Sequence, residues 1–334
     1  MERWVTKIWY QGGAAKWLIA PLSLLYGFIV KRRRAKFLAG KATTETLAAP
    51  VVVVGNITAG GTGKTPLVVW LVTELRRKGY RPGIVSRGYR GAADSWPQKV
   101  TSTSDPKMVG DEPVMLASRC GCPVAAGPDR IAAGELLIAE GVNAIVADDG
   151  LQHYRLHRDC EIAVVDGERQ FGNGLLLPAG PLREPVSRLS EVDVVVINGT
   201  ATEPHHLSMK LRQLPALPIH GGDPKPVELF NATPVHAVAG IGNPDRFFGQ
   251  LEKAGLEIIQ HVHPDHHGYE KGDICFSDNY PVLMTEKDAV KCRQFADARH
   301  WYVPLEPSFA QNDANVLLDT LSQRFAKANA RQES

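Results

Sequence analysis

A phosphate-binding loop is the clearest chemical signature in this sequence. Residues 58–65 read Thr-Ala-Gly-Gly-Thr-Gly-Lys-Thr, between the β-branched run Pro50–Val54 and a helical pattern at Leu67–Lys78. Glycines let backbone N–H groups converge on phosphate oxygens, and the start of the following helix adds a positive dipole. The first position is threonine where the usual pattern has glycine, but this physics survives the change. The residues expected to bind the nucleotide are Thr58, Ala59, Gly60, Gly61, Thr62, Gly63, Lys64 and Thr65.

A metal site should accompany this loop. Lys64 can reach the β- and γ-phosphates of a nucleotide, and the Thr65 hydroxyl can coordinate Mg²⁺. The apolar run 143–147 ends in Asp148 and Asp149, the form expected of a strand that supplies carboxylates to the metal. An acidic pair at a strand end can also be a solvated turn, and the upstream loop favours the metal. Gln152 and His153 follow, at the sheet edge where α/β proteins bind ligands.

Three arginines stand in loops rich in glycine or proline. They are Arg87, Arg90 and Arg183. A guanidinium in such a loop can grip a phosphate with two hydrogen bonds. Surface ion pairing is an equal alternative for each of them.

The N-terminus carries an apolar run with a basic flank. Residues 17–30 are almost all apolar, and Lys31 to Arg34 are four consecutive cations. Fourteen helical residues reach only about 21 Å, short of the roughly 30 Å hydrocarbon core. A buried packing helix is one interpretation. The cations favour the other, a monotopic or barely spanning anchor at an anionic membrane surface with its basic end in the cytoplasm.

Composition indicates a folded α/β protein. The chain has 334 residues, 44% of them hydrophobic and 22% charged, with a net charge of +2. That balance excludes wholesale disorder and gives no bulk charge for nucleic acid binding. The five cysteines make no C-x-x-C pair, so a disulfide framework or zinc ribbon is not expected. No obligate protein partner is evident either.

The alternation of strands and helices predicts a doubly wound, mostly parallel sheet around the phosphate loop, with a second, smaller α/β domain. We expect an N-terminal membrane-associated helix in residues 1–40 and a nucleotide-binding domain in 41–214. A proline-rich linker at 215–233 and a C-terminal domain at 234–334 should follow. The expected strands are 50–54, 82–86, 143–149, 161–166, 193–198, 234–239, 257–262, 282–284 and 301–304, with a further helix at 130–140.

Taken together, the motifs resemble the tetraacyldisaccharide 4′-kinases of lipid A biosynthesis. The matching segments run from Gly55 to Lys291 and include S-R-G-Y-R-G (86–91), V-G-D-E-P (109–113), D-D-G-L-Q-H (148–153) and L-P-A-G-P-L-R-E (177–184). G-I-G-N-P (240–244), R-F-F (246–248), H-P-D-H-H (263–267) and T-E-K-D-A-V-K (285–291) continue the match. The short N-terminal apolar helix also matches.

The resemblance implies an ATP-dependent kinase. Its acceptor would be the 4′-hydroxyl of an acylated glucosamine disaccharide 1-phosphate lipid, at the cytoplasmic face of the bacterial inner membrane. Asp111, expected in a loop, would be the base, and His266 from the second domain would orient it or raise its basicity. Lys64 would act on the transferred phosphate. Mg²⁺ would bind Thr65, Asp148 and Asp149, and the substrate would contact Arg87, Tyr89, Gln152, His153, Arg183 and Glu184.

The residues alone also allow other functions, which are a metal site, an ATPase switch and a GTP-binding module. His261, His263, His266 and His267 could suggest a metal site, but no fixed zinc spacing appears and clustered histidines beside a Pro-Asp turn are often solvated. A membrane-bound ATPase switch of the partitioning or division-site type would want a lysine where Ala59 stands. A GTP-binding module would want N-K-x-D, a spacing that T-E-K-D at 285–288 does not supply.

Overall fold

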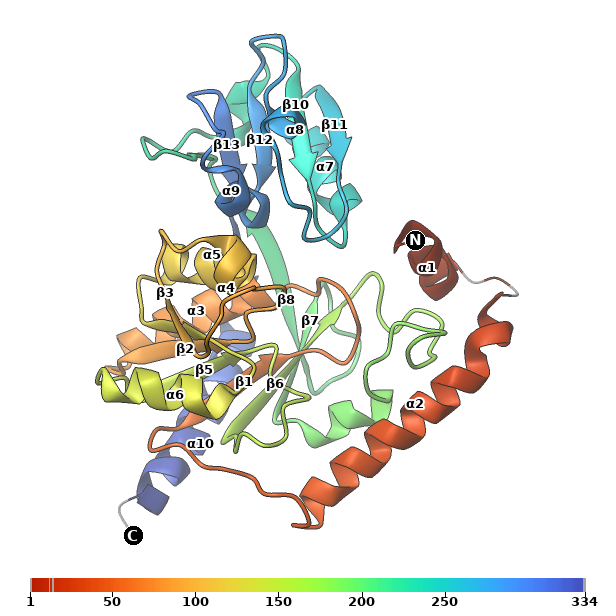
Figure 1. The fold of residues 1–334 in the computed structure, drawn as a ribbon, viewed down its shortest axis with the longest axis vertical. Coiled ribbons are helices and arrows are strands. Elements are labelled where there is room, and N and C mark those ends of the chain that lie inside the picture. The colour runs from red at the N-terminus through yellow and green to blue at the C-terminus, as the bar shows by residue number, and fades with distance from the viewer. Residues whose placement is uncertain (1, 12, 14, 333–334) are drawn as a thin grey trace.

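The computed structural model describes residues 2–11, 13 and 15–332, and it contains two sheets, each with its own helices (Figure 1). The larger sheet has nine strands in the order β14-β8-β7-β6-β1-β5-β2-β4-β3. Their bounds are β1 Val51–Gly55, β2 Pro82–Ser86, β3 Gln98–Val100, β4 Val124–Ala126, β5 Ala144–Asp148, β6 Cys160–Asp166, β7 Val194–Asn198, β8 His206–Gln213 and β14 Leu305–Phe309. The strands from β8 to β4 are parallel, and only β14 and β3 at the two edges are antiparallel. The predicted doubly wound, mostly parallel sheet is confirmed.

Both faces of this sheet are covered, which is why its central strands read as continuous apolar runs. Successive side chains of a strand point to opposite faces, and β1 divides accordingly. Val52 and Val54 join one core with α3 (Lys64–Arg77), α5 (Asp111–Cys120) and α10 (Gln311–Gln332). Val51 and Val53 join the other core with α6 (Arg130–Ala139). The phosphate loop leaves β1 between these two layers.

The smaller sheet has five strands in the order β11-β10-β12-β13-β9, and only β9 is antiparallel. The bounds are β9 Leu217–Pro218, β10 Val235–Ala239, β11 Ile258–Val262, β12 Val282–Thr285 and β13 His300–Val303. The helices of this part are α7 Pro244–Lys253, α8 Lys271–Ile274 and α9 Glu286–Cys292, with a 3₁₀ turn at Val227–Phe230. A short helix α4 (Pro106–Val109) and a second 3₁₀ turn (Val186–Glu191) belong to the larger unit.

The division of the chain differs from the predicted one at two places. Residues 305–332 do not stay with the smaller sheet: β14 pairs with β8, and α10 packs Leu317, Leu321 and Phe325 into the larger core. The predicted linker at 215–233 is also structured, since β9 joins the smaller sheet and Phe230 lies in its core. Proline frequency does not reveal such pairing, because prolines are tolerated at the antiparallel edge that β9 forms.

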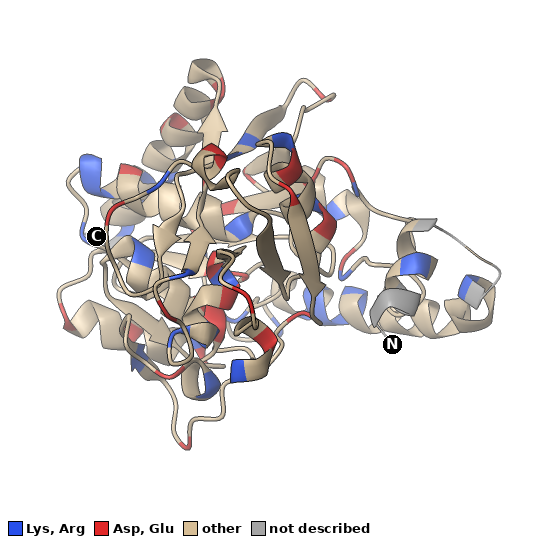
Figure 2. Ribbon diagram, turned by 90° about the horizontal axis from the view of Figure 1, so that it is seen from above, with Lys and Arg blue, Asp and Glu red and all other residues tan. Residues whose placement is uncertain are grey.

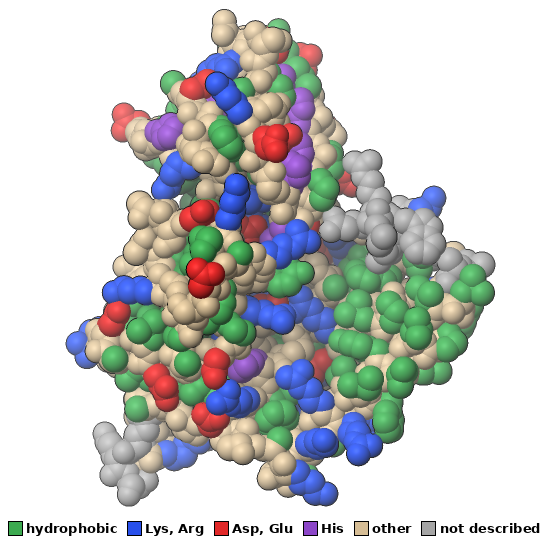
Figure 3. All heavy atoms as spheres, in the orientation of Figure 1, with side chains coloured by type: hydrophobic (Ala, Val, Ile, Leu, Met, Phe, Trp, Pro, Cys, Tyr) green, Lys and Arg blue, Asp and Glu red, His purple; other side chains and the backbone are tan. Residues whose placement is uncertain are grey.

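The N-terminal helices lie beside the larger unit (Figure 1). They are α1 (Glu2–Gln11) and α2 (Ala15–Leu38), and α2 continues well past the predicted run at 17–30. No helix among the described residues is both long enough and apolar enough to span a membrane. Hydrophobic side chains nevertheless cover the outer face of α2 in the space-filling view (Figure 3), where Leu18 is 84% and Leu24 77% exposed. Acidic and basic residues are interspersed over the rest of the molecule (Figure 2).

We predict that α10 is required for the stability of the larger unit. Phe325 is fully buried and meets the Tyr80 ring edge to face at 5.5 Å. Replacing it with alanine should lower the free energy of unfolding in urea by about 3–5 kcal/mol, the usual cost of emptying a large aromatic site in a core. Val316→Ala, on the exposed side of the same helix, is the matched control and should change little. Equal effects of the two substitutions would show that α10 is only loosely attached.

Candidate active site

The phosphate loop has the backbone geometry that its glycines predict. Gly60 has a φ of 102° and Gly63 a φ of 95°, in the left-handed region. A Cβ at Gly63 would also come within 2.7 Å of the Asn198 amide nitrogen, which donates to the carbonyl of Thr62 at 3.1 Å. The helix α3 begins at Lys64 itself, so its free N–H groups and this ammonium lie at the same end.

The first two loop residues are engaged by another segment of the chain. The Ala59 N–H donates to the carbonyl of Pro181 at 2.7 Å, and Thr58 forms a β-bridge with Leu182. Of the eight loop residues predicted to bind the nucleotide, Gly60 to Thr65 line the cavity described below, whereas Thr58 and Ala59 are not among its lining residues. The segment 181–182 therefore fixes the shape of the loop and places the next residue, Arg183, beside it.

The two carboxylates at the end of β5 lie in different environments. Asp149 ion-pairs with Arg183 at 2.9 Å and with Lys64 at 3.4 Å, and its φ is 49°, an uncommon conformation for aspartate. Burial opposes its ionisation, but Lys64 and Arg183 outweigh burial and hold the pKa of Asp149 below its usual range. Asp148 is buried, and this burial, followed by the nearby Glu112 and Asp149 carboxylates, raises its pKa to about 7.

A cavity of about 690 Å³ is lined by Lys64, Asp149 and Arg183 and lies between the two units. The larger unit contributes the phosphate loop, Arg87, Tyr89, Asp149, Gln152 and Arg183, and the smaller one contributes Asn243, Arg246, His266 and Lys287, among others. Tyr26 of α2 and Leu177 also line it. Most of the substrate contacts predicted from the sequence therefore face one space.

Two predicted substrate contacts lie elsewhere. Glu184 is buried and accepts hydrogen bonds from Gln152 at 3.0 Å and from the Tyr154 hydroxyl, outside the cavity lining. His153 is also outside that lining, and burial followed by Arg130 lowers its pKa to about 4. Each of these two motifs turns some of its side chains away from the cavity, so only some of the residues in a motif line it. Glu184 and His153 therefore lie outside the cavity lining, and their contact with a substrate stays a prediction.

Asp111 and His266 meet across the two units, as the sequence predicts. His266 Nδ1 is 3.0 Å from Asp111 Oδ2 and 3.2 Å from Oδ1. The expected loop setting of Asp111 is wrong, because Asp111 is the first residue of α5 and follows Gly110, whose φ is 93°. A carboxylate in the first turn of a helix is stabilised by the helix dipole. Pro113 does not break the helix there, because the first N–H groups need no intrahelical partner.

The contacts of His266 define its tautomer. Lys287 Nζ lies 3.3 Å from His266 Nε2, and an ammonium can only donate, so Nε2 is the acceptor. The proton is then on Nδ1, which donates to the Asp111 carboxylate. Burial works against the Asp111 charge, but the His266 hydrogen bond, Lys287 and Lys291 outweigh it and lower its pKa to about 2. Asp111 is therefore an ionised hydrogen-bond acceptor and a weak base in this geometry.

Sequence reasoning did not select several residues of the smaller unit that complete the site. Lys287 contacts the carboxylates of Glu112 at 3.3 Å and Asp265 at 3.2 Å, and the surrounding carboxylates outweigh its burial and raise its pKa. Arg246 donates to Asn198 at 3.2 Å on the opposite side of the cavity. The position of Lys287 in the sequence could have indicated this role. It follows β12 closely, at the carboxyl end of a parallel strand, where ligands bind in α/β folds.

The groups around the loop suit a nucleotide with a hard divalent cation. Thr65 and Asp149 line the cavity and Asp148 lies next in the chain, so all three donors are oxygens, which Mg²⁺ prefers. Lys64, Arg87, Arg90 and Arg183 supply positive charge to the same space. The fold and this arrangement define a P-loop phosphotransferase that assembles its site between two α/β units.

Comparison with known proteins narrows this class. A family model described as "Tetraacyldisaccharide-1-P 4′-kinase" matches residues 15–324. The tetraacyldisaccharide 4′-kinase of Nitrosococcus oceani is 50% identical over 97% of this chain and 96% of its own length. The tetraacyldisaccharide 4′-kinase of Alkalilimnicola ehrlichii is 53% identical over 86% of this chain and 87% of its own length. The crystal structure described as the "apo" form of LpxK from Aquifex aeolicus in complex with ATP superposes with a TM-score of 0.79 at 25% identity, covering 93% of this chain and 99% of that one.

The chain therefore belongs to the tetraacyldisaccharide-1-phosphate 4′-kinase family. Its activity is that of a lipid A kinase, transfer of a phosphoryl group to the 4′-hydroxyl of the disaccharide.

We predict that Lys64→Ala lowers kcat by about 10²–10³, because removing one preorganised donor from developing phosphate charge usually costs this much. Lys78→Ala, an exposed lysine just past the other end of α3, is the matched control. The measurement is transfer of radiolabel from ATP to the lipid acceptor. Both variants should unfold at the same urea concentration as the parent, and near-normal lipid phosphorylation by Lys64→Ala would contradict the role of this lysine.

Proposed function

We propose that the cavity binds ATP with Mg²⁺ on the phosphate loop and directs the γ-phosphoryl group toward a 4′-hydroxyl held beside Asp111. The observation that carries this proposal is the Asp111–His266 contact at 3.0 Å, because His266 lines the same cavity as Lys64 and Arg183 and Asp111 lies next to it. Mg²⁺, when bound by Thr65 and Asp149 with Asp148 behind them, would neutralise charge on the β- and γ-phosphates. The backbone N–H groups of the loop and Lys64 orient the phosphates in line with the acceptor oxygen.

Asp111 orients the acceptor hydroxyl and receives its proton late in the reaction. With a pKa of about 2, the carboxylate is too weak a base to deprotonate a free alcohol. Phosphoryl transfer passes through a loose transition state, so the hydroxyl becomes acidic only as its bond to phosphorus forms. A fixed acceptor at hydrogen-bond distance is sufficient for that step, and two negative phosphates in the cavity would also raise the pKa of Asp111.

His266 and Lys287 hold this carboxylate in place. The Nδ1–H of His266 is shared between the two Asp111 oxygens, and Lys287 donates a hydrogen bond to the other ring nitrogen, Nε2. The edge of His266 also meets the Tyr89 ring at 5.2 Å, and Arg90 reaches the carbonyls of Asp265 and His266 at 3.4 Å. The loop motif that contains Tyr89 and Arg90 thus connects the two units at the reacting centre, and we assign His266 a positioning role.

The acceptor enters from the side of α2. Ser23 donates to the carbonyl of Leu176 at 2.7 Å and accepts from the Ala179 N–H at 2.9 Å, while the Tyr26 hydroxyl donates to the carbonyl of Arg183 at 3.3 Å. One face of the helix is therefore attached to the segment that carries Arg183. The opposite face is the exposed apolar surface, so a lipid resting on it would have its head group beside the cavity.

That surface supports association with the cytoplasmic face of the inner membrane. Large exposed apolar patches on soluble proteins mark interaction sites, and this one adjoins the exposed cations Lys31, Arg32, Arg33 and Lys36. Arg34 is instead held by Glu191 of the larger unit. A helix with this pairing of apolar face and basic flank lies in the interface of an anionic leaflet.

The Asp111–His266 pair should behave as one unit in a double-mutant cycle. Asp111→Asn keeps the shape of the side chain and removes the acceptor charge, so kcat should fall by roughly 10²–10⁴, as for other general bases. His266→Ala should also lower kcat, and the kcat of the double variant should be little below that of the slower single variant. The measurement is lipid phosphorylation at saturating ATP.

His205→Ala, an exposed histidine between β7 and β8, is the control for loss of an imidazole and should keep full activity. Fully multiplicative losses would mean that the two residues act separately, and His266 would then be assigned to phosphate or substrate binding. Ordinary turnover by Asp111→Asn would remove the base assignment.

The membrane surface can be tested without removing α2. The variant Leu18→Ser/Leu24→Ser should sediment less with anionic vesicles and show a higher KM for the lipid acceptor, because it lowers apolar area on the outer face only. Its KM for ATP should be unchanged, since neither side chain lines the cavity.

Leu229→Ser is the matched control, because Leu229 is 59% exposed on the smaller unit, away from α2. Vesicle binding that is unchanged in the double variant, or lost equally in the control, would place the membrane contact elsewhere.

A further inference from the structure

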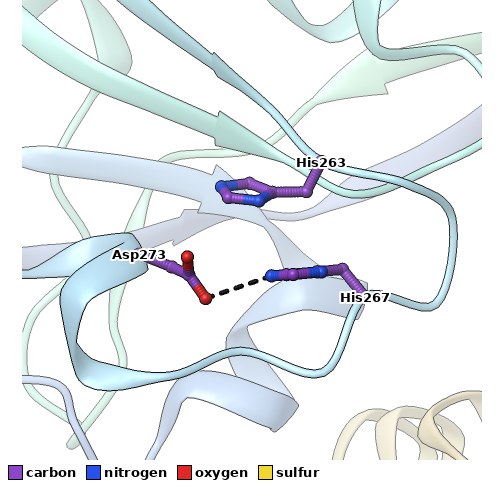
Figure 4. A group of neighbouring side chains, drawn as sticks. All are labelled: His263, His267 and Asp273. Carbon is purple, nitrogen blue, oxygen red and sulfur yellow. Dashed lines mark hydrogen bonds and ion pairs between the residues drawn. The ribbon is translucent and has the colours of Figure 1, made fainter.

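Three metal-ligating side chains converge in the smaller unit, outside the cavity lining. They are His263, which follows β11, His267, four residues later in the same loop, and Asp273 in α8. One ligand atom from each lies within 4.8 Å of the other two, and within the described part of the chain this is the only such group of three. Figure 4 shows the two imidazoles one above the other, with ring nitrogens directed toward the side where Asp273 lies.

One distance is close to that expected around a bound ion, and the other ligand atoms lie within 4.8 Å. His267 Nε2 and Asp273 Oδ2 are 3.0 Å apart. Metal bonds of 2.0–2.1 Å at a tetrahedral angle separate two ligand atoms by about 3.3 Å, so that pair would widen by only about 0.3 Å. The His263 and His267 rings stack with centroids 4.5 Å apart and planes 21° apart, which keeps a ring nitrogen of His263 within 4.8 Å of the other two ligand atoms.

Hydrogen bonding explains only part of this arrangement. Asp273 Oδ2 accepts from His267 and from the Glu270 N–H at 2.8 Å, which is part of a capping box at the start of α8. That accounts for Asp273 and His267. His263 has no side-chain hydrogen bond in the structure, although its ring is stacked on His267 and packed edge to face against Tyr269 at 5.1 Å. A half-buried imidazole with both nitrogens unbonded beside a histidine–carboxylate pair is a free third ligand.

Donor chemistry selects the ion. Two imidazoles and one carboxylate, with a fourth position open to water, match the ligand set of Zn²⁺. Mg²⁺ prefers an all-oxygen octahedron and would not compete here. We propose that His263, His267 and Asp273 form a zinc-type site for a divalent transition-metal ion, separate from the nucleotide-bound Mg²⁺.

The position of this site gives the ion a structural role. His266 lies between the two histidine ligands in sequence, with a φ of 59°, a left-handed conformation that is uncommon for a non-glycine residue. Binding at both ends of the turn 263–267 would fix the backbone that presents His266 to Asp111. The ion would therefore order the loop without contacting either substrate.

The test is direct binding of Zn²⁺ to the full chain, freed of any affinity tag and kept in excess Mg²⁺ without nucleotide. Isothermal titration calorimetry should give one equivalent bound to the parent protein. His263→Gln removes a ligand without breaking a hydrogen bond and should weaken Zn²⁺ binding at least 10-fold. Co²⁺ should give the intense visible absorption of a four-coordinate site in the parent and lose it in the variant. His205→Gln, at an exposed histidine elsewhere, should bind Zn²⁺ as the parent does.

Hydrogen exchange supplies a second readout that does not depend on activity. Zn²⁺ should slow exchange of the amides in 264–270 in the parent and leave them unchanged in His263→Gln. Absence of Zn²⁺ binding by the parent would overturn the proposal, as would equal binding by His263→Gln or equal loss in His205→Gln. Binding without protection of 264–270 would overturn the ordering role of the ion.

Discussion

The site depends on keeping the charge of Asp111 where water is largely excluded. This carboxylate is only 6% exposed, and an ionised group in such a place must be paired or hydrogen-bonded. Within its own unit it has the start of α5 and one hydrogen bond, from the Glu112 N–H at 2.9 Å. The remaining compensation comes from His266, Lys287 and Lys291 of the smaller unit. With the two units in contact, the charge of Asp111 is thus compensated largely by groups of the smaller unit, which links the state of this carboxylate to their arrangement.

Charged groups take part in the contact between the units beyond Asp111 itself. Arg119 pairs with Glu286, Lys287 bridges Glu112 and Asp265, and Arg246 reaches Asn198 beside the phosphate loop. A polar interface of this kind is weaker than an apolar one and permits relative motion of the units. Substrates that add negative charge to the cavity change the balance among these pairs. Binding of the nucleotide and of the lipid would therefore affect the same ion pairs that orient the acceptor hydroxyl.

Contiguous motifs were predicted well from the sequence because their physics is local. The run 58–65 after a buried strand determines a phosphate loop, and uninterrupted apolar runs determine the central parallel strands. Pairing between distant segments could not be predicted: β14 joins β8, and Thr58 and Ala59 are held by residues 181–182. Nor does a motif specify which of its side chains face the ligand, so Gln152 reaches the cavity while Glu184 lies behind it. Lys287 was missed because its partners, Glu112 on one side and Asp265 and His266 on the other, come from two segments that lie far apart in the sequence.

The central claim is that the smaller unit holds Asp111 as an ion through a defined tautomer of His266. The most direct measurement is the ¹⁵N spectrum of the protein labelled at histidine, with His266 assigned by comparison with His266→Gln. The account predicts a proton on Nδ1 and a hydrogen-bonded, unprotonated Nε2, and it predicts that the Nε2 resonance shifts when Lys287→Met removes the donor to Nε2. A proton on Nε2 in the parent protein, or a spectrum of His266 that does not respond to Lys287→Met, would contradict it.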